Sequence, residues 1–246
     1  MEIYDYILEL EKRAKSASAA MNTASDETRR AVLLDLADRV EAASADILAA
    51  NALDLAAAAA NGVPTPMLDR LRLTDARLSG MAEAVRALAH LDDPVGGGKT
   101  WATPAGLTIT ERRVPLGVVA MIFEARPNVT LDAAALCIRS GNAAVLRGGK
   151  EAIESGRAIC RVIGDALEAH GLPRDGVCFV ERTERAGADA LLTIRGYVDV
   201  LIPRGGKGLI RNVVDNAKVP TIETGAGNCH IYVEKTADFD MARRII

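Results

Sequence analysis

The pattern of hydrophobic and polar positions changes near residue 100. Before it, apolar residues recur every three or four positions, as they do along the buried face of a helix. This period, with Ser25-Asp26 and Thr74-Asp75 as helix caps, predicts helices over residues 3–21, 26–60 and 71–91. Trp101 to Arg113 alternates apolar and polar side chains instead, which predicts a half-exposed strand or hairpin.

From Val114 onward, short apolar runs alternate with helical patterns. The first run, Val114 to Phe123, is too short to cross a membrane and suits a strand buried on both faces. The following strands are predicted at residues 143–146, 176–180, 197–202 and 231–233, and the helices at 129–140, 152–170, 184–192 and 208–216. Asn128 is the predicted N-cap of the first of these helices. Such alternation indicates an α/β fold with a mostly parallel sheet and helices on both faces.

Three polar turns follow predicted strands: EARPN at 124–128, RGGKE at 147–151 and PRGGKG at 203–208. Because parallel strands end along one edge of the sheet, we expect these turns to lie together. Basic side chains, glycines and free amides at a helix start suit a ligand that bears phosphate. Solvated loop charges are the alternative interpretation. The motif G-x-G-x-x-G is absent. Gly96 to Lys99 is not a P-loop either, because the first glycine of that motif would fall at position 93, which is Asp93.

Composition restricts the possible partners. The chain has 246 residues, 49% of them hydrophobic, a formal net charge of -3 and 3% aromatic residues. A mixed charge with few aromatic side chains favours neither nucleic acid nor an anionic membrane, and no apolar run has transmembrane length. We therefore expect a cytoplasmic protein that binds a small molecule.

Cysteine and histidine spacing indicates no metal site. The cysteines, Cys137, Cys160, Cys178 and Cys229, show no C-x-x-C pattern and lie in apolar segments, as reduced buried thiols do. The three histidines lie at predicted helix ends or beside Cys229, and none has an Asp partner fixed by nearby sequence, so we assign them no role.

The motifs EARPN, SGNAAVLRGGKEA, PRGGKGLI and IETGAGNCHIYVE, in this order, resemble the gamma-glutamyl phosphate reductases of the aldehyde dehydrogenase superfamily. The resemblance covers essentially the whole chain. It implies an N-terminal helical region at 1–100, an NADP-binding α/β domain with a Rossmann-like sheet at 101–233 and the start of a truncated catalytic domain at 234–246. It also implies the reduction of L-glutamyl 5-phosphate by NADPH through a cysteine thioester, the second step of proline biosynthesis.

The resemblance also implies cofactor-binding residues. Arg147 and Lys150 match the Lys-x-x-Glu pattern of NAD-dependent relatives, and Lys150 in place of the glutamate would attract the 2′-phosphate of NADPH. The other residues matched to cofactor-binding positions are Arg204, Gly205, Gly206, Glu223 and Gly225. The first three match the turn near the pyrophosphate. Glu223 is expected either to position the nicotinamide ribose or simply to end a strand.

Arg126 and Asn128 are candidates for contacts with the substrate phosphate or with an oxyanion. The family nucleophile lies in a later Q-R-P-x-x-C-N-A motif, so we expect it beyond Ile246 and do not assign Cys229. We accordingly expect the chain alone to be inactive.

When full length, the enzyme is expected to form a homo-oligomer and to be paired functionally with glutamate 5-kinase. Two other hypotheses stay open. One is a hydrolytic aldehyde dehydrogenase, which Lys150 and EARPN disfavour, and the other is a non-catalytic nucleotide-binding or assembly module.

Overall fold

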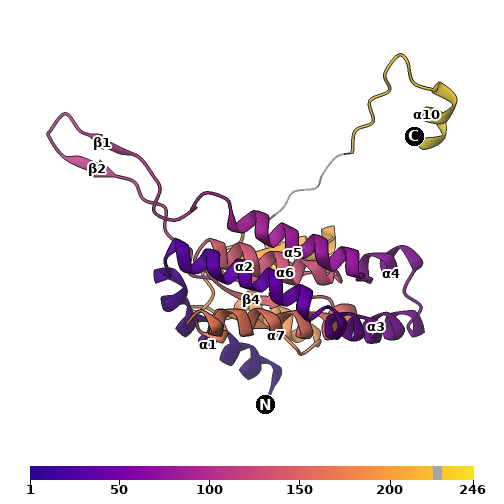
Figure 1. Cartoon of the computed structure of the whole chain (residues 1–246), viewed down its shortest axis with the longest axis horizontal. Helices are drawn as coiled ribbons and strands as arrows, with labels where there is room; N and C mark the ends of the chain where they lie inside the picture. The colour runs from indigo at the N-terminus through magenta and orange to yellow at the C-terminus, as the bar shows by residue number, and fades with distance from the viewer. Residues whose placement is uncertain (224–228) are drawn as a thin grey trace.

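A parallel four-stranded sheet forms the centre of the molecule in the computed structural model, which describes residues 1–223 and 229–246 (Figure 1). The strands are β3 (Val118–Phe123), β4 (Ala143–Arg147), β5 (Val177–Phe179) and β6 (Val200–Arg204). Their order across the sheet is β5-β4-β3-β6. Thr221 adds an isolated parallel bridge to Leu201 at the outer side of β6. Because β3 and β4 consist almost entirely of buried apolar residues, the sheet is covered on both faces, as predicted.

The connections between the strands place the helices on both faces. Helices α6 (Pro127–Arg139) and α7 (Ile153–Ala169) lead from β3 through β4 to β5, in one direction across the sheet. Helix α8 (Arg185–Thr193) leads back to β6 on the other side of β3, and α9 (Lys207–Asn216) follows β6. Right-handed crossovers in opposite directions lie on opposite faces. The boundary between β3 and β6 is therefore a topological switch point, where ligands usually bind in open α/β sheets.

The N-terminal helices add to both layers. Helix α1 (Ile3–Thr23) packs on α8, and α2 (Asp26–Ala42), α3 (Ser44–Ala60) and α5 (Asp75–Ala89) cover α6 and α7. The predicted helix over 26–60 is wrong in one respect: it is two helices that meet at Ala43 with a bend of 67°. The sequence around Ala43 contains no glycine or proline from which the break could be predicted.

Both predicted caps are confirmed, because Ser25 Oγ accepts from Thr28 N at 3.0 Å and Thr74 Oγ1 accepts from Arg77 N at 3.2 Å. Helix α4 (Thr65–Leu71) was not predicted, since Pro64, which precedes it, and Pro66 within its first turn suggested a loop, although proline is well tolerated in a first helical turn. In the described part of the chain no single helix is long and apolar enough to cross a membrane; only α2 and α3, taken together across their bend, reach that length and composition.

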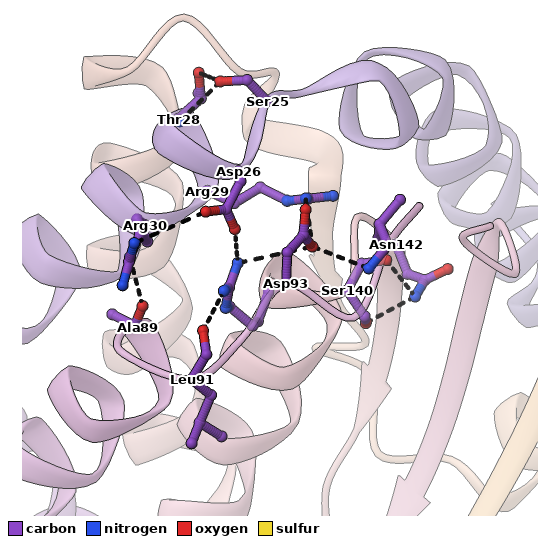
Figure 2. A network of polar contacts seen from close by, with 12 residues as sticks. Ser25, Asp26, Thr28, Arg29, Arg30, Ala89, Leu91, Asp93, Ser140 and Asn142 are labelled. Atoms are coloured by element: carbon purple, nitrogen blue, oxygen red, sulfur yellow. Dashed lines mark hydrogen bonds and ion pairs between the residues drawn. The ribbon is translucent and has the colours of Figure 1, made fainter. Parts of the chain in front are cut away.

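A buried cluster of ion pairs joins α2, α6 and the segment after α5 (Figure 2). Arg29 Nη2 donates to both carboxylate oxygens of Asp93 at 2.8 Å, and Arg139 pairs with Asp26 and donates to the carbonyl of Leu91. Both guanidinium groups are almost completely buried. Removing a single partner would leave a buried charge, so this cluster holds the three segments in one arrangement.

Other segments differ from the sequence prediction at their ends. The first central strand begins at Val118 rather than Val114, because Gly117 has a φ of 120° and its N–H donates to the side chain of Asn142. The strand predicted at 231–233 is wrong: these residues lie outside any strand, and Ile231 and Tyr232 are exposed. The hairpin is confirmed as β1 (Thr100–Ala102) paired with β2 (Thr108–Thr110), and it projects from the body (Figure 1).

Three short helical elements complete the described chain. Short 3-10 turns, η1 (Lys150–Ala152) and η2 (Arg174–Gly176), precede α7 and β5, and α10 (Phe239–Ile245) lies near the C-terminus.

Candidate functional site

The turns after β3, β4 and β6 meet at one edge of the sheet, as predicted. Two glycines permit the close approach. A Cβ atom on Gly149 would lie 2.8 Å from the backbone nitrogen of Ala125, and one on Gly205 would lie 3.0 Å from Glu124 Oε1. At Gly149 the close neighbour is backbone, so a side chain there would push the two turns apart, whereas at Gly205 it would displace the side chains of Glu124 and Leu209.

A cavity of about 330 Å³ lies where β3 and β6 end, at the switch point. It is lined by Glu124, Arg126, Val129, Arg204, Gly205 and Gly206, and we call it the switch-point cavity. Four of these residues were candidates from the sequence: Arg126, Arg204, Gly205 and Gly206. The structure brings them together from two different βα turns.

The start of α9 faces the switch-point cavity and already holds an anionic group. Glu124 Oε1 accepts a hydrogen bond of 2.7 Å from the backbone N–H of Gly206, the residue that precedes α9. Because a helix N-terminus combines free amides with a favourable dipole, it binds phosphate oxygens in the same way. The exposed carboxylate of Glu124 thus shows that the start of α9 can bind an anionic group. Sequence analysis missed Glu124, since an acid beside a predicted anion site suggested only turn formation.

Arg147 and Lys150 lie on the same edge but line neither the switch-point cavity nor the cleft described below. Arg147 Nη2 donates to the carbonyls of Glu184 and Thr183 at 3.2 and 3.4 Å, and burial lowers the pKa of its guanidinium. It ties the end of β4 to the segment before α8. Lys150 begins η1, is exposed and has no ion-pair partner among the described residues.

The remaining cofactor candidates follow β6 in the sequence. Glu223 is exposed and lies two residues after Thr221, which pairs with Leu201, so it is placed near the carboxyl end of β6. Gly225 lies outside the described residues.

A second cavity of about 520 Å³ lies between α4, α5 and the start of α6, and we call it the α5–α6 cleft. Arg126 lines both this cleft and the switch-point cavity. The predicted N-cap role of Asn128 is wrong, because α6 begins one residue earlier, at Pro127. Asn128 instead donates its amide to Asp132 Oδ2 at 3.0 Å inside the cleft. Burial raises the pKa of Asp132, although the hydrogen bond from Asn128 opposes this shift.

The cleft also contains residues that sequence analysis did not select: Arg70, Arg72 and Asp132. Arg70 belongs to α4, which the sequence suggested was a loop, and Arg72 follows it. Asp132 looked like one polar residue on an apolar helix. The tertiary packing of α4, α5 and the start of α6 places these side chains with Arg126 around one cleft.

The N-terminus of α7 is occupied from within the protein. Asp54 on α3 accepts hydrogen bonds from Glu154 N at 3.1 Å, from Ser155 N at 2.8 Å and from Ser155 Oγ at 2.6 Å. Asn51, one turn earlier, donates to Ser155 Oγ and to the carbonyl of Leu71. These amides are therefore not available to a ligand.

The environments of the cysteines do not favour a nucleophile in this chain. Burial raises the thiol pKa of Cys137 and Cys178 to about 12, and it also raises that of Cys160. A thiol with a raised pKa is poorly nucleophilic because only the thiolate attacks. Cys229 is exposed and lines neither cavity. No cluster of acidic, cysteine and histidine side chains that could bind a metal occurs among the described residues.

Comparison with known proteins gives one consistent result. Residues 6–246 match the aldehyde dehydrogenase family. The gamma-glutamyl phosphate reductase of Clostridium acetobutylicum is 47% identical over 247 aligned positions, which cover 100% of this chain and 59% of that protein. The chain thus spans less than two thirds of the length of this relative.

Solved structures agree. The gamma-glutamyl phosphate reductase of Thermotoga maritima superposes with a TM-score of 0.88 at 38% identity, covering 96% of this chain and 57% of that one. The Saccharomyces cerevisiae gamma-glutamyl phosphate reductase gives 0.80 at 34% identity, covering 96% and 60%. The chain therefore belongs to the aldehyde dehydrogenase family, has its fold, and resembles the gamma-glutamyl phosphate reductases within it.

Proposed function

We propose that this chain supplies cofactor-binding and substrate-orienting residues for the NADPH-dependent reduction of L-glutamyl 5-phosphate to L-glutamate 5-semialdehyde and phosphate, a step of proline biosynthesis. The observation that carries the proposal is the switch-point cavity, which gathers Arg126, Arg204 and the start of α9 around a position already taken by a carboxylate. Relatives named for this reaction support the substrate.

Each residue has a proposed task. NADPH, when bound, supplies the hydride. The N–H of Gly206 and the guanidinium of Arg204 bind its phosphates at the start of α9, where Glu124 now accepts the hydrogen bond. Lys150, exposed on η1, contacts the 2′-phosphate, and Glu223 positions the nicotinamide ribose.

The substrate end of the site uses the turn after β3. Arg126 and Asn128 face the α5–α6 cleft, and we assign them the acyl phosphate and the oxyanion that forms when the acyl carbon is attacked. The amide of Asn128 is fixed by its hydrogen bond to Asp132, which limits its rotation before the reaction. None of the four cysteines is assigned as the nucleophile that forms the thioester.

Partners and location follow from the proposed chemistry. An acyl phosphate is hydrolysed readily in water, so pairing with the kinase that makes it, glutamate 5-kinase, would limit its loss. We also propose a cytoplasmic homo-oligomer for the full-length enzyme.

The reverse reaction tests the proposal in a full-length protein that carries this sequence. NADP reduction with glutamate semialdehyde is expected to require inorganic phosphate. Arg126→Gln should lower kcat/KM about 10-fold or more through the lost charge-assisted contact, whereas Arg195→Gln, exposed after α8, serves as the matched control. Oxidation of glutamate semialdehyde at a rate that does not depend on phosphate would support the hydrolytic aldehyde dehydrogenase instead. If NADP is not reduced with or without phosphate, the proposed function is wrong.

A further inference from the structure

The α5–α6 cleft is chemically suited to a ligand with two opposite charges. The proposed substrate has two ends: an acyl phosphate, which reacts, and an α-amino acid group, which does not. The switch-point cavity and the cleft share Arg126, so a molecule held between them would extend from the cofactor side toward α5. The floor of the cleft includes Leu73 and Met81, both buried, which suits the methylene carbons of a short chain.

Positive charge in the cleft is only partly neutralised. Arg77 is committed to the protein, since it donates to the carbonyls of Asp69 and Arg72 and pairs with the Asp69 carboxylate at 3.2 Å. Arg70 and Arg72 line the same cleft, are exposed and have no carboxylate partner among the described residues. A carboxylate entering the cleft would therefore meet two guanidinium groups that are not yet paired.

One negative charge lies deeper in the cleft. Asp132 projects from α6, is half-buried, and its Oδ2 accepts from the amide of Asn128. Its other oxygen, Oδ1, has no hydrogen-bond donor within the described part of the chain. Burial raises the pKa of this carboxyl, which means that the folded protein lacks a cation that would stabilise the ionised form. An ammonium group from a ligand would supply that cation.

We infer that the α5–α6 cleft is the subsite for the non-reacting α-amino acid end of the substrate, with Asp132 binding the α-ammonium group and Arg70 and Arg72 binding the α-carboxylate. This inference rests on the proposed function for its substrate. It adds specificity residues in the helical N-terminal region, Arg70 and Arg72, and one on α6, Asp132, all outside the sequence motifs that carry the family resemblance. In this arrangement Asn128, assigned to the reacting end of the substrate, and Asp132, assigned to the ammonium group, are hydrogen-bonded neighbours on one helix.

Three aldehyde substrates distinguish the contribution of the ammonium group from that of the carboxylate. Glutamate semialdehyde has both, 5-oxopentanoate keeps the terminal carboxylate but lacks the ammonium group, and pentanal has neither. The assay is phosphate-dependent NADP reduction by a full-length protein that carries this sequence, and the measured quantity is the ratio of kcat/KM between two aldehydes. A ratio cancels changes in folding or in the position of Asn128, because these affect all three aldehydes alike.

The variants should change different ratios. Asp132→Asn is expected to reduce the preference for glutamate semialdehyde over 5-oxopentanoate about 10-fold, mostly through KM, as the loss of one charge-assisted contact predicts. Arg72→Gln, alone or with Arg70→Gln, should reduce the preference for 5-oxopentanoate over pentanal by a similar factor of roughly 10. Glu83→Gln, exposed on α5, and Arg195→Gln are matched controls and should change neither ratio.

The outcomes are distinct. If the parent protein oxidises glutamate semialdehyde with phosphate but Asp132→Asn and Arg72→Gln keep the parent ratios, the subsite is wrong and the proposed function stands. If the parent protein does not oxidise the semialdehyde with phosphate at all, the proposed function itself is wrong. Opposite changes, with Asp132→Asn affecting the carboxylate ratio and Arg72→Gln the ammonium ratio, would also overturn the assignment.

Discussion

The N-terminal ends of α7 and α9 are built in the same way, but carboxylates from different parts of the protein accept hydrogen bonds from their backbone amides. Each helix follows a buried parallel strand and a glycine-containing turn with basic residues, and each presents backbone amides at the same edge of the sheet. At α7 the amides bind Asp54, which is 4% exposed and comes from α3. At α9 the amide of Gly206 binds Glu124, which is exposed and comes from the adjoining turn.

The difference lies in how easily each occupant can leave the helix start. Asp54 accepts three hydrogen bonds and is surrounded by protein, so displacing it would leave donors buried without partners. Glu124 accepts one hydrogen bond from the α9 start and is solvated after it moves away. A ligand phosphate can therefore replace Glu124 but not Asp54. Three predictions test this comparison, and a fourth extends it to a buried carboxylate that has no hydrogen-bond donor among the described residues.

The largest effect is expected at α7. Asp54→Ala removes all three hydrogen bonds and leaves buried donors, so it should lower the free energy of unfolding by about 4 kcal/mol. Asp46→Ala, exposed on the same helix, should change it by less than about 0.5 kcal/mol. Urea unfolding measures both. Equal, small changes would mean that the α7 start is as open as the α9 start.

Lys150 tests where the cofactor phosphates lie relative to the two helices. Lys150→Glu in a full-length enzyme should weaken the binding of NADPH relative to that of NADH by about 3 kcal/mol, because it removes an attraction to the 2′-phosphate and adds a repulsion at an exposed site. Lys218→Glu, also exposed but beyond α9, is the control. Dissociation constants for both cofactors provide the comparison. If both cofactors weaken equally, Lys150 does not contact the 2′-phosphate.

Glu11 on α1 shows the effect of burying a carboxylate without donors. Both of its oxygens are buried with no partner among the described residues, and burial raises its pKa from 4.5 to about 8. The folded state therefore binds this proton more tightly than the unfolded chain, so the contribution of Glu11 to stability is most favourable below about pH 4.5 and is lost as the pH rises toward 8.

Glu11→Gln removes the titrating group and should raise the free energy of unfolding by about 2 kcal/mol at alkaline pH and by much less in acid. Glu9→Gln, exposed on α1, controls for net charge. Thermal unfolding at several pH values distinguishes the two. A stabilisation that does not vary with pH would contradict the assignment of this proton to Glu11.

The smallest effect is expected at α9. Glu124→Gln weakens the competing anion, so NADPH should bind about 5-fold more tightly, a change of roughly 1 kcal/mol at an exposed site. Glu151→Gln places the same change on a neighbouring turn without a hydrogen bond to the α9 start and should have no effect. Fluorescence titration of NADPH measures both. Weaker binding by Glu124→Gln would mean that Glu124 supports the cofactor rather than competing with it.

Most of the fold could be predicted from the sequence because the signals are local. The apolar runs of β3 and β4 and the three-to-four-residue period of the helices are properties of neighbouring residues. The break at Ala43 and helix α4 were missed because tertiary packing decides them. The predicted strand at 231–233 failed for a related reason, since an apolar run forms a strand only where another strand can pair with it.

By itself, the sequence determined the α/β class, the order of helices and strands, the edge at which the polar turns meet and the family resemblance. Only the tertiary structure decided which carboxylate occupies each helix start, because Asp54 and Glu124 reach them from distant or separate segments. It alone brought Arg70, Arg72 and Asp132 into one cleft. Secondary structure depends on side chains a few residues apart, whereas hydrogen-bond satisfaction and charge pairing depend on whatever the completed fold places within about 3 Å.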